Sequence, residues 1–139
     1  MAAVCPGREP AQLGGGVKHQ VALDDQGVVC VRVIGPSTPA EVTAVGDAML
    51  VAFAQSSPCL VLIDLGQAKL NIDRGTREAL QPYASRLVWD RMAVFGVSHF
   101  NRMMFRIVLT VLGMAGKARF FDTEQGARAW LQEAPAQSA

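Results

Sequence analysis

The stretch CLVLID, residues 59–64, decides the fold that this sequence predicts. It is a short, continuous apolar run that ends in a carboxylate, which is typical of a strand covered on both faces of a sheet. The helix-breaking SSP of residues 56–58 precedes it. We therefore expect an interior strand, and with it an α/β domain.

The sequence before this run predicts a hairpin followed by a helix. Residues 17–23 and 28–34 have the β-branched content of strands, and DDQG at 24–27 is typical of the turn between them. The helix begins at Thr38-Pro39-Ala40-Glu41, where a hydroxyl cap, a proline and a glutamate satisfy the free amides of a helix start. It runs to about Gln55.

The sequence after this run alternates between helices and strands. Asp73 is placed to cap the first of these helices, and Asp122 to cap the last, with Gln125 at the reciprocal capping position. The expected elements are a loop over 65–71, a helix over 73–85, a strand over 92–97, a helix over 99–114, a strand over 118–121 and a final helix.

This order predicts one α/β domain over residues 17–132. We expect a single mixed, mostly parallel β-sheet with an N-terminal antiparallel hairpin and about four helices, in the order β-β-α-β-α-β-α-β-α. Residues 1–16, which contain several Gly and Pro residues, are expected to form a flexible tail, and residues 133–139 a second tail.

The composition fits one globular domain and excludes several classes of protein. The chain has 139 residues, of which 50% are hydrophobic and 18% are charged, so coiled coils, collagens and disordered chains are excluded. Its formal net charge of +1 gives no electrostatic basis for binding nucleic acid. The most apolar segment, residues 103–115, is too short to span a bilayer, and the N-terminus lacks the apolar stretch of a secretory signal.

The cysteines indicate a reducing, cytoplasmic location. Their odd number and wide spacing exclude a disulfide framework and a CxxC metal or redox pair. We expect Cys30 and Cys59, which lie in apolar runs, to be buried thiols, and Cys5 to be exposed in the N-terminal tail.

Residue patterns of known catalytic sites are missing from the sequence, so we do not expect an enzyme. His19 and His99 are far apart in the chain, and neither has a partner at metal-ligand spacing. The glycines at 14–16 precede a strand and therefore do not form a phosphate loop. We expect no catalytic residue, no metal and no cofactor.

Asp64 and a group of arginines are the candidate binding residues. Asp64 ends a buried strand at the edge where open α/β sheets bind ligands, although such carboxylates also hold loops in place. Arg102 and Arg106 are four residues apart and share one helix face. They are either part of a solvated surface or the receptors of an acidic partner or an anionic head group.

The helix expected over 99–114 is apolar around nearly its whole circumference. One side of it would stay exposed on an isolated domain. Three occupants are open: another part of the same chain, a second copy or partner protein, and a lipid or acyl chain. Methionines at its start, including Met103, provide adaptable packing.

Two segments carry a resemblance to a known family. The segment from Leu62 to Gly75, LIDLGQAKLNIDRG, resembles the phosphoacceptor region of STAS domains, the anti-sigma-factor antagonists. The ending from Ala118 to Leu131, ARFFDTEQGARAWL, is similar to the finish of the small bacterial SpoIIAA-like, or STAS-like, proteins. The resemblance covers about residues 17–132, and it implies a non-enzymatic regulatory or binding module.

The sequence departs from this family at the phosphorylated position. Where the antagonists have a serine between Asp and Gly, this chain has Asp73-Arg74-Gly75, which is one residue shorter and lacks the hydroxyl. The resemblance therefore implies that the standard serine switch is absent. Thr76 is the nearest substitute acceptor, at a helix start where a phosphate is electrostatically tolerated.

Two functions remain open at this point. The first is a protein-interaction module, without catalysis, that acts through a homodimer or a separate protein partner. The second is a carrier or sensor of a small apolar ligand or lipid, held between the sheet and the 99–114 helix, and a gap of several hundred Å³ would favour it. The expected site residues lie in the 65–75 loop and on the exposed side of that helix: Asp64, Gly66, Asp73, Arg74, Thr76, Arg102, Met103 and Arg106.

Overall fold

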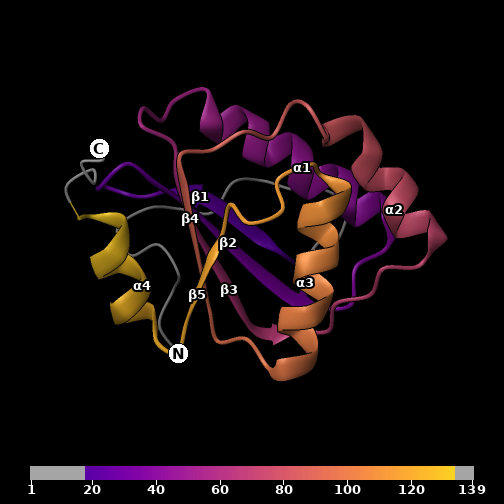
Figure 1. Cartoon of the computed structure of the whole chain (residues 1–139). Helices are drawn as coiled ribbons and strands as arrows, with labels where there is room; N and C mark the ends of the chain where they lie inside the picture. Colours follow the sequence, from indigo (N-terminus) through magenta and orange to yellow (C-terminus); the bar gives the residue numbers. More distant parts are fainter. Residues whose placement is uncertain (1–17, 134–139) are drawn as a thin grey trace.

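Five strands form one sheet whose order follows the order of the chain (Figure 1). The computed structural model describes residues 18–133; the two expected tails, apart from Glu133, and Cys5 lie outside the described residues. β1 is antiparallel to β2, and every later pair is parallel, so the predicted mixed sheet is confirmed. The strands are β1 (Gln20–Leu23), β2 (Val28–Gly35), β3 (Leu60–Ala68), β4 (Arg91–Phe95) and β5 (Arg119–Phe121).

Three of the four helices lie on one face of the sheet. Each of them connects one parallel strand to the next, from β2 to β5, and every connection moves along the sheet in the same direction. Because such crossover connections are right-handed, these helices lie on the same face. The last helix follows the edge strand and packs on β3 and β4 from the opposite face (Figure 1). The helices are α1 (Pro39–Phe53), α2 (Arg74–Leu80) with the short 3-10 helix η1 (Gln81–Tyr83), α3 (His99–Val111) and α4 (Glu124–Leu131).

β3 is buried on both faces, as the opening stretch of sequence predicts. Val61 and Ile63 point into the larger core, under α1 and α3. Leu62 points into the smaller core, which also contains Ala127 and Leu131 of α4. All three β3 side chains are at most 3% exposed, so this strand is the centre of the molecule.

Capping side chains fix where the helices begin. Thr38 and Glu41 form the predicted capping box of α1, and Asp73 caps α2 by accepting a hydrogen bond from the amide of Thr76. The prediction for α4 is wrong by one residue, because Thr123 and not Asp122 accepts from the amide of Gly126. The helix therefore begins at Glu124.

β3 is longer than predicted. Residues 65–68, expected in a loop, continue the strand, because β2 still pairs with them beyond a register shift and places Gly35 beside Ala68. Asp64 consequently lies within β3 and not at its end.

Two helices are shorter than predicted. α2 ends at Leu80, where Pro82, which has no amide hydrogen, fits only the tighter turn of η1. α3 ends at Val111, because Gly113 follows with a φ of 74° and stops the helix.

Candidate functional site

The segment that joins β3 to α2, residues 69–73, is held against α3 by Asn101. The Asn101 side chain donates to the carbonyl of Ala68 at 3.0 Å and accepts from the amide of Leu70 at 3.3 Å. Asn101 is buried on the same stripe of α3 as Phe105 and Leu109. Sequence reasoning missed this residue, although a single amide on an otherwise apolar stripe is the signal that marks it.

The start of α2 separates the predicted residues into an exposed pair and a buried one. Asp73 and Arg74 are exposed, and Arg74 Nε lies 3.1 Å from Glu78. Thr76 is 4% exposed, and its hydroxyl accepts from the Asn71 side chain at 3.0 Å. The hydrogen bond from the Thr76 amide, with others from the Thr76 and Asn71 side chains, lowers the pKa of Asp73. The Asp73 carboxylate therefore stays ionised as the cap.

Asp64 lies apart from this helix start, on the α4 face of the sheet. Its Oδ2 accepts from Arg32 Nε at 3.2 Å, and its Oδ1 accepts from the Gly66 amide at 2.8 Å. The backbone of Gly66 also lies so close to Gly96 that a Cβ on Gly96 would be 3.0 Å from the Gly66 nitrogen. Asp64 and Gly66 lie where the pairing of β2 and β3 shifts register, so their contacts have a structural role inside β3.

The outer face of α3 brings the other three predicted residues together. Phe100 and Met103 are 55% and 54% exposed, and Ile107 is 37% exposed. The guanidinium groups of Arg102 and Arg106 lie over the ring of Phe120, 5.0 and 5.6 Å from its centroid, which confirms that they share a face. We call this surface, Phe100, Arg102, Met103, Arg106 and Ile107, the α3 face.

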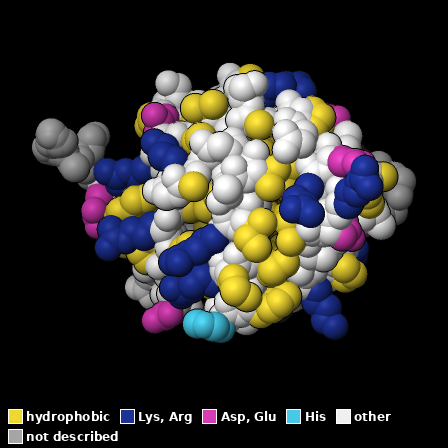
Figure 2. Space-filling model, turned by 45° about the vertical axis from the view of Figure 1, so that its right-hand side comes forward, with side chains coloured by type: hydrophobic (Ala, Val, Ile, Leu, Met, Phe, Trp, Pro, Cys, Tyr) yellow, Lys and Arg dark blue, Asp and Glu magenta, His cyan; other side chains and the backbone are white. Residues whose placement is uncertain are grey.

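The α3 face is hollowed and basic. A groove of about 420 Å³ runs along it, and Figure 2 shows a band of hydrophobic side chains on this side of the molecule between groups of basic ones. The helix has two arginines and no acidic residue. The groove is lined by His99, Arg102, Met103, Arg106, Ile107 and Thr110.

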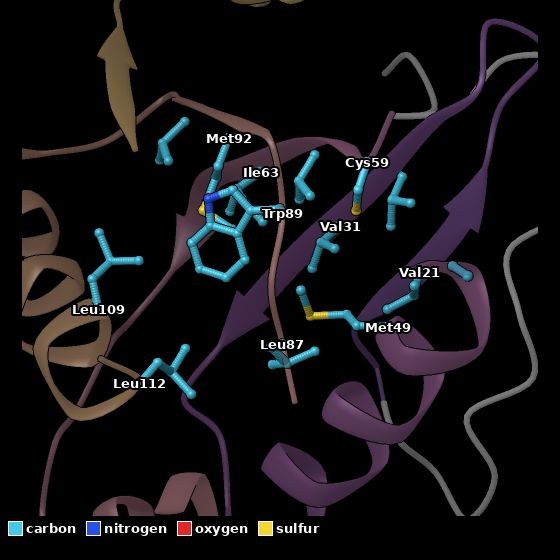
Figure 3. Close-up of a cluster of buried hydrophobic side chains, with 14 of the residues drawn as sticks. Val21, Val31, Met49, Cys59, Ile63, Leu87, Trp89, Met92, Leu109 and Leu112 are labelled. Atoms are coloured by element: carbon cyan, nitrogen blue, oxygen red, sulfur yellow. The ribbon is translucent and has the colours of Figure 1, made fainter. Parts of the chain in front are cut away.

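A cavity of about 130 Å³ lies on the inner side of the same helices. Its walls are the sheet, α1, the α2–η1 region and α3, and Figure 3 shows several of these side chains pointing toward one another from strands and helices. Protein interiors contain few voids larger than a water molecule, so a space of this size in the core is unusual. Leu70, Asn71 and Thr76, from the loop and the helix start, also line it.

His19, which is buried and directly precedes β1, lines this cavity. Its Nδ1 accepts from the Ile34 amide at 3.0 Å, so Nε2 carries the hydrogen of the neutral ring and donates to Ser37 Oγ at 2.8 Å. Burial, followed by the charge of Lys18, lowers the pKa of His19, and nearby Glu41 opposes this. The ring is therefore neutral at pH 7.

Within the described residues, neither metal ligands nor cysteines form a further site. Among residues 18–133, no three His, Cys, Asp or Glu side chains gather in an arrangement that would hold a metal ion. Cys30 and Cys59 are buried thiols, as predicted, and burial raises the pKa of Cys59 to about 11. No helix in the described part of the chain has the length and apolar content needed to cross a membrane.

Comparison with known proteins identifies the family. The sequence model of the SpoIIAA-like family matches residues 28–132. No curated protein of similar sequence was found. A solved structure, described as that of the anti-sigma factor antagonist SpoIIAA in its unphosphorylated form, is similar with a TM-score of 0.59 at 15% sequence identity; the match covers 84% of this chain and 99% of that one. The chain therefore belongs to the SpoIIAA-like family.

Proposed function

We propose that this chain is a STAS-type regulatory module that works by binding another protein through the α3 face and the adjoining residues 69–74. The observation that carries the proposal is the exposure of Phe100, Met103 and Ile107 on one side of a single helix. Large apolar side chains grouped in this way are typical of interaction surfaces. Membership of the SpoIIAA-like family supports a regulatory role without catalysis.

The charges around the α3 face favour an acidic partner over a second copy of the chain. A two-fold dimer would place the same patch against itself, so that Arg102 and Arg106 of both subunits would approach one another. A partner with carboxylates around an apolar centre would instead pair with both arginines. Their stacking on Phe120 holds them in place before binding, which lowers the entropy cost of the contact.

We propose further that the module is not switched by phosphorylation at the start of α2. Arg74 occupies the place of the serine, and the substitute acceptor Thr76 is buried with its hydroxyl bonded to Asn71. A phosphate there would have to enter beside the ionised Asp73 cap, which would repel it. An intact-mass spectrum of the protein from growing and stressed cells is expected to show no phosphorylated fraction.

Site-specific photo-crosslinking in the source cells tests the protein-binding function. A photo-reactive phenylalanine analogue at position 103 is expected to trap a defined partner. The same analogue at position 51 is the matched control, because Val51 is 63% exposed on α1. The crosslink at 103 is expected to disappear in the R102E/R106E variant. Equal products at both positions would overturn the proposal, and a crosslink to the chain itself would replace the acidic partner by a homodimer.

A second function, the sensing of a small ligand, is favoured by the apolar lining of the cavity and not by its size. Ligand pockets usually measure about 300–1,000 Å³, and this cavity measures about 130 Å³. It is therefore too small for a lipid carrier and smaller than a carrier of drug-sized molecules needs. We therefore prefer protein binding to ligand sensing as the function of this chain. The two buried thiols, which form no disulfide, fit either function in a reducing compartment such as the cytoplasm.

A further inference from the structure

We infer that the cavity between the sheet and α1, η1 and α3 is a binding site for a small, uncharged, hydrocarbon-like molecule of about the size of a benzene ring. This inference rests on the second function proposed above, to which it gives a ligand class. It is independent of protein binding at the α3 face, which lies on the opposite side of the helix.

The walls of the cavity consist almost entirely of carbon and sulfur. Among the described residues that line it, none is Asp, Glu, Lys or Arg. A charged ligand would leave water without meeting a counter-charge in this lining, so carboxylates and amines are disfavoured as ligands. The apolar lining comes from the sheet (Val31, Val33, Ile63, Met92), from α1 (Val42, Val45, Met49), from α3 (Phe105, Val108, Leu109) and from Leu70, Leu80, Leu87, Trp89 and Leu112.

The polar side chains at the cavity use their hydrogen bonds on the protein itself. His19 forms hydrogen bonds with the Ile34 amide and the Ser37 hydroxyl. The Tyr83 hydroxyl has two acceptors within reach, Asp47 Oδ1 at 2.7 Å and the carbonyl oxygen of Thr43 at 3.0 Å. Trp89 donates from Nε1 to the carbonyl of Lys117 at 2.8 Å, away from the cavity. Throughout residues 18–133, every buried side-chain nitrogen and oxygen has a hydrogen-bond partner.

The apolar lining and the hydrogen bonds already made by its buried polar atoms decide the chemistry of the ligand. A polar ligand would meet few partners in this site, and it would lose hydrogen bonds to water without full replacement. A hydrocarbon has no hydrogen bonds to water to lose, and it makes van der Waals contacts with lining atoms that have no partner in the empty cavity. An apolar cavity of about 150 Å³ stays dry and binds benzene in a well-studied engineered protein, which sets the size of ligand that fits here.

The sulfur atoms of the lining suit a ligand of variable shape. Met49 and Met92 both face the cavity, and methionine side chains adjust to irregular partners at little cost and make favourable contacts with aromatic rings. Phe105 and Trp89 add two aromatic surfaces. Aromatic hydrocarbons such as benzene and toluene are therefore the best probes.

Titration with benzene and toluene tests the inference, with methyl NMR spectra of Met49, Met92 and Leu109 as the readout. Saturable shifts of these methyl signals are expected, together with a rise in Tm that grows with ligand concentration. Benzoate and benzylamine have similar size but carry a charge, and they are expected to cause no saturable shift. Shifts that never saturate, or benzoate binding as tightly as benzene, would overturn the inference.

Filling the cavity provides the matched variants. Val45 lines the cavity and Val51 is exposed on the same helix. Val45→Phe is expected to weaken benzene binding at least tenfold, whereas Val51→Phe leaves it unchanged. If Val45→Phe fails to fold, Val108→Met on α3 fills the same space from the other side with a flexible side chain. Undiminished binding in a folded cavity-filling variant would show that benzene binds elsewhere, which contradicts the inference.

The two proposals fail separately. The R102E/R106E variant is expected to lose the crosslink at position 103 but to bind benzene as the parent protein does. If benzene does not bind and the crosslink persists, the cavity inference falls and protein binding stands. If the crosslink is absent and benzene binds, protein binding falls and the cavity inference stands.

Discussion

Arg128 on α4 donates from Nη1 to Oδ2 of Asp24 at 2.8 Å and thereby joins the last helix to the first turn of the domain. Asp24 is buried, and it also accepts from the amides of Gln26 and Val28, so it closes the turn between β1 and β2. Glu124 binds the other side of the guanidinium at 2.8 Å. Arg128 therefore links the β1–β2 hairpin to α4, although the two are distant in sequence.

Arg128→Ala is expected to lower the free energy of unfolding by about 2–3 kcal/mol, because it leaves the buried Asp24 carboxylate without its charged partner. Arg74→Ala is the control, since the Arg74–Glu78 pair is also spaced i,i+4 but is 89% and 66% exposed. That variant should lose less than about 0.5 kcal/mol. Urea unfolding of both variants checks the prediction, and equal losses would contradict it.

The effect of Arg128→Ala is expected to depend on pH. Burial disfavours the ionised form of Asp24, but hydrogen bonds from Arg128 and from the Val28 and Gln26 amides outweigh this and lower its pKa below 3.8. The carboxylate therefore adds stability that is complete above that value and is lost as the pH falls through the folded-state pKa. The difference in unfolding free energy between parent and variant should be constant above about pH 5 and shrink below about pH 4. A difference that grows in acid would contradict this assignment.

His19 is expected to make the domain less stable in mild acid. Its pKa in the folded protein is below 6.5, so the unfolded chain takes up a proton first as the pH falls. The stability that the neutral ring provides is complete above pH 6.5 and is lost as the pH falls toward the folded-state pKa. His19→Asn keeps an acceptor for the Ile34 amide and should flatten the stability profile between about pH 7 and 5.

Thr123→Ala is expected to cost about 1 kcal/mol, because it removes the hydroxyl that accepts from the Gly126 amide at the start of α4. Asp122→Ala changes the neighbouring polar residue, which does not serve as the cap. Its effect should be within about 0.5 kcal/mol. Thermal unfolding of the pair distinguishes the two residues, and the opposite ranking would show that Asp122 caps the helix.

Gly46→Ala is expected to destabilise the protein by about 1–3 kcal/mol through overpacking. A Cβ at this position in α1 would lie 2.6–2.9 Å from the ring of Tyr83. The ring has little freedom to move, because its hydroxyl is bonded to Thr43 and Asp47. Ala44→Gly on the same helix is the control for helix propensity alone, and it should cost about 1 kcal/mol. A neutral Gly46→Ala would mean that Tyr83 shifts into the cavity.

Local signals in the sequence predicted most of the fold. The capping box of Thr38 and Glu41 and the cap at Asp73 depend only on residues within one helical turn, and both were confirmed. The prediction of Asp122 as the cap of α4 was wrong because its neighbour Thr123 is an equally good capping residue, and local chemistry does not separate the two. The continuation of β3 through Ala68 was missed because it depends on pairing with β2, more than thirty residues earlier.

The candidate site was predicted less completely than the fold. The spacing of Arg102 and Arg106 correctly placed them on one face, because helical periodicity fixes it. Burial of Thr76 and the distance of Asp64 from the α3 face follow from how β3 and α2 pack, which no short motif encodes. The sequence left a ligand site between the sheet and the 99–114 helix as one of two alternatives. It did not predict the cavity, because a void depends on the fit of many side chains from separate elements.

The strand order has a consequence for synthesis of this protein. Each new strand pairs with the strand made just before it, so the sheet can grow one strand at a time while the chain leaves the ribosome. α4 is made last, and until it forms, its partners Leu62 and Ala93 lack the cover that Ala127 and Leu131 provide. A nascent chain stalled before α4 would display an apolar sheet face. The aggregation risk of this sheet face therefore persists until the last helix has been made.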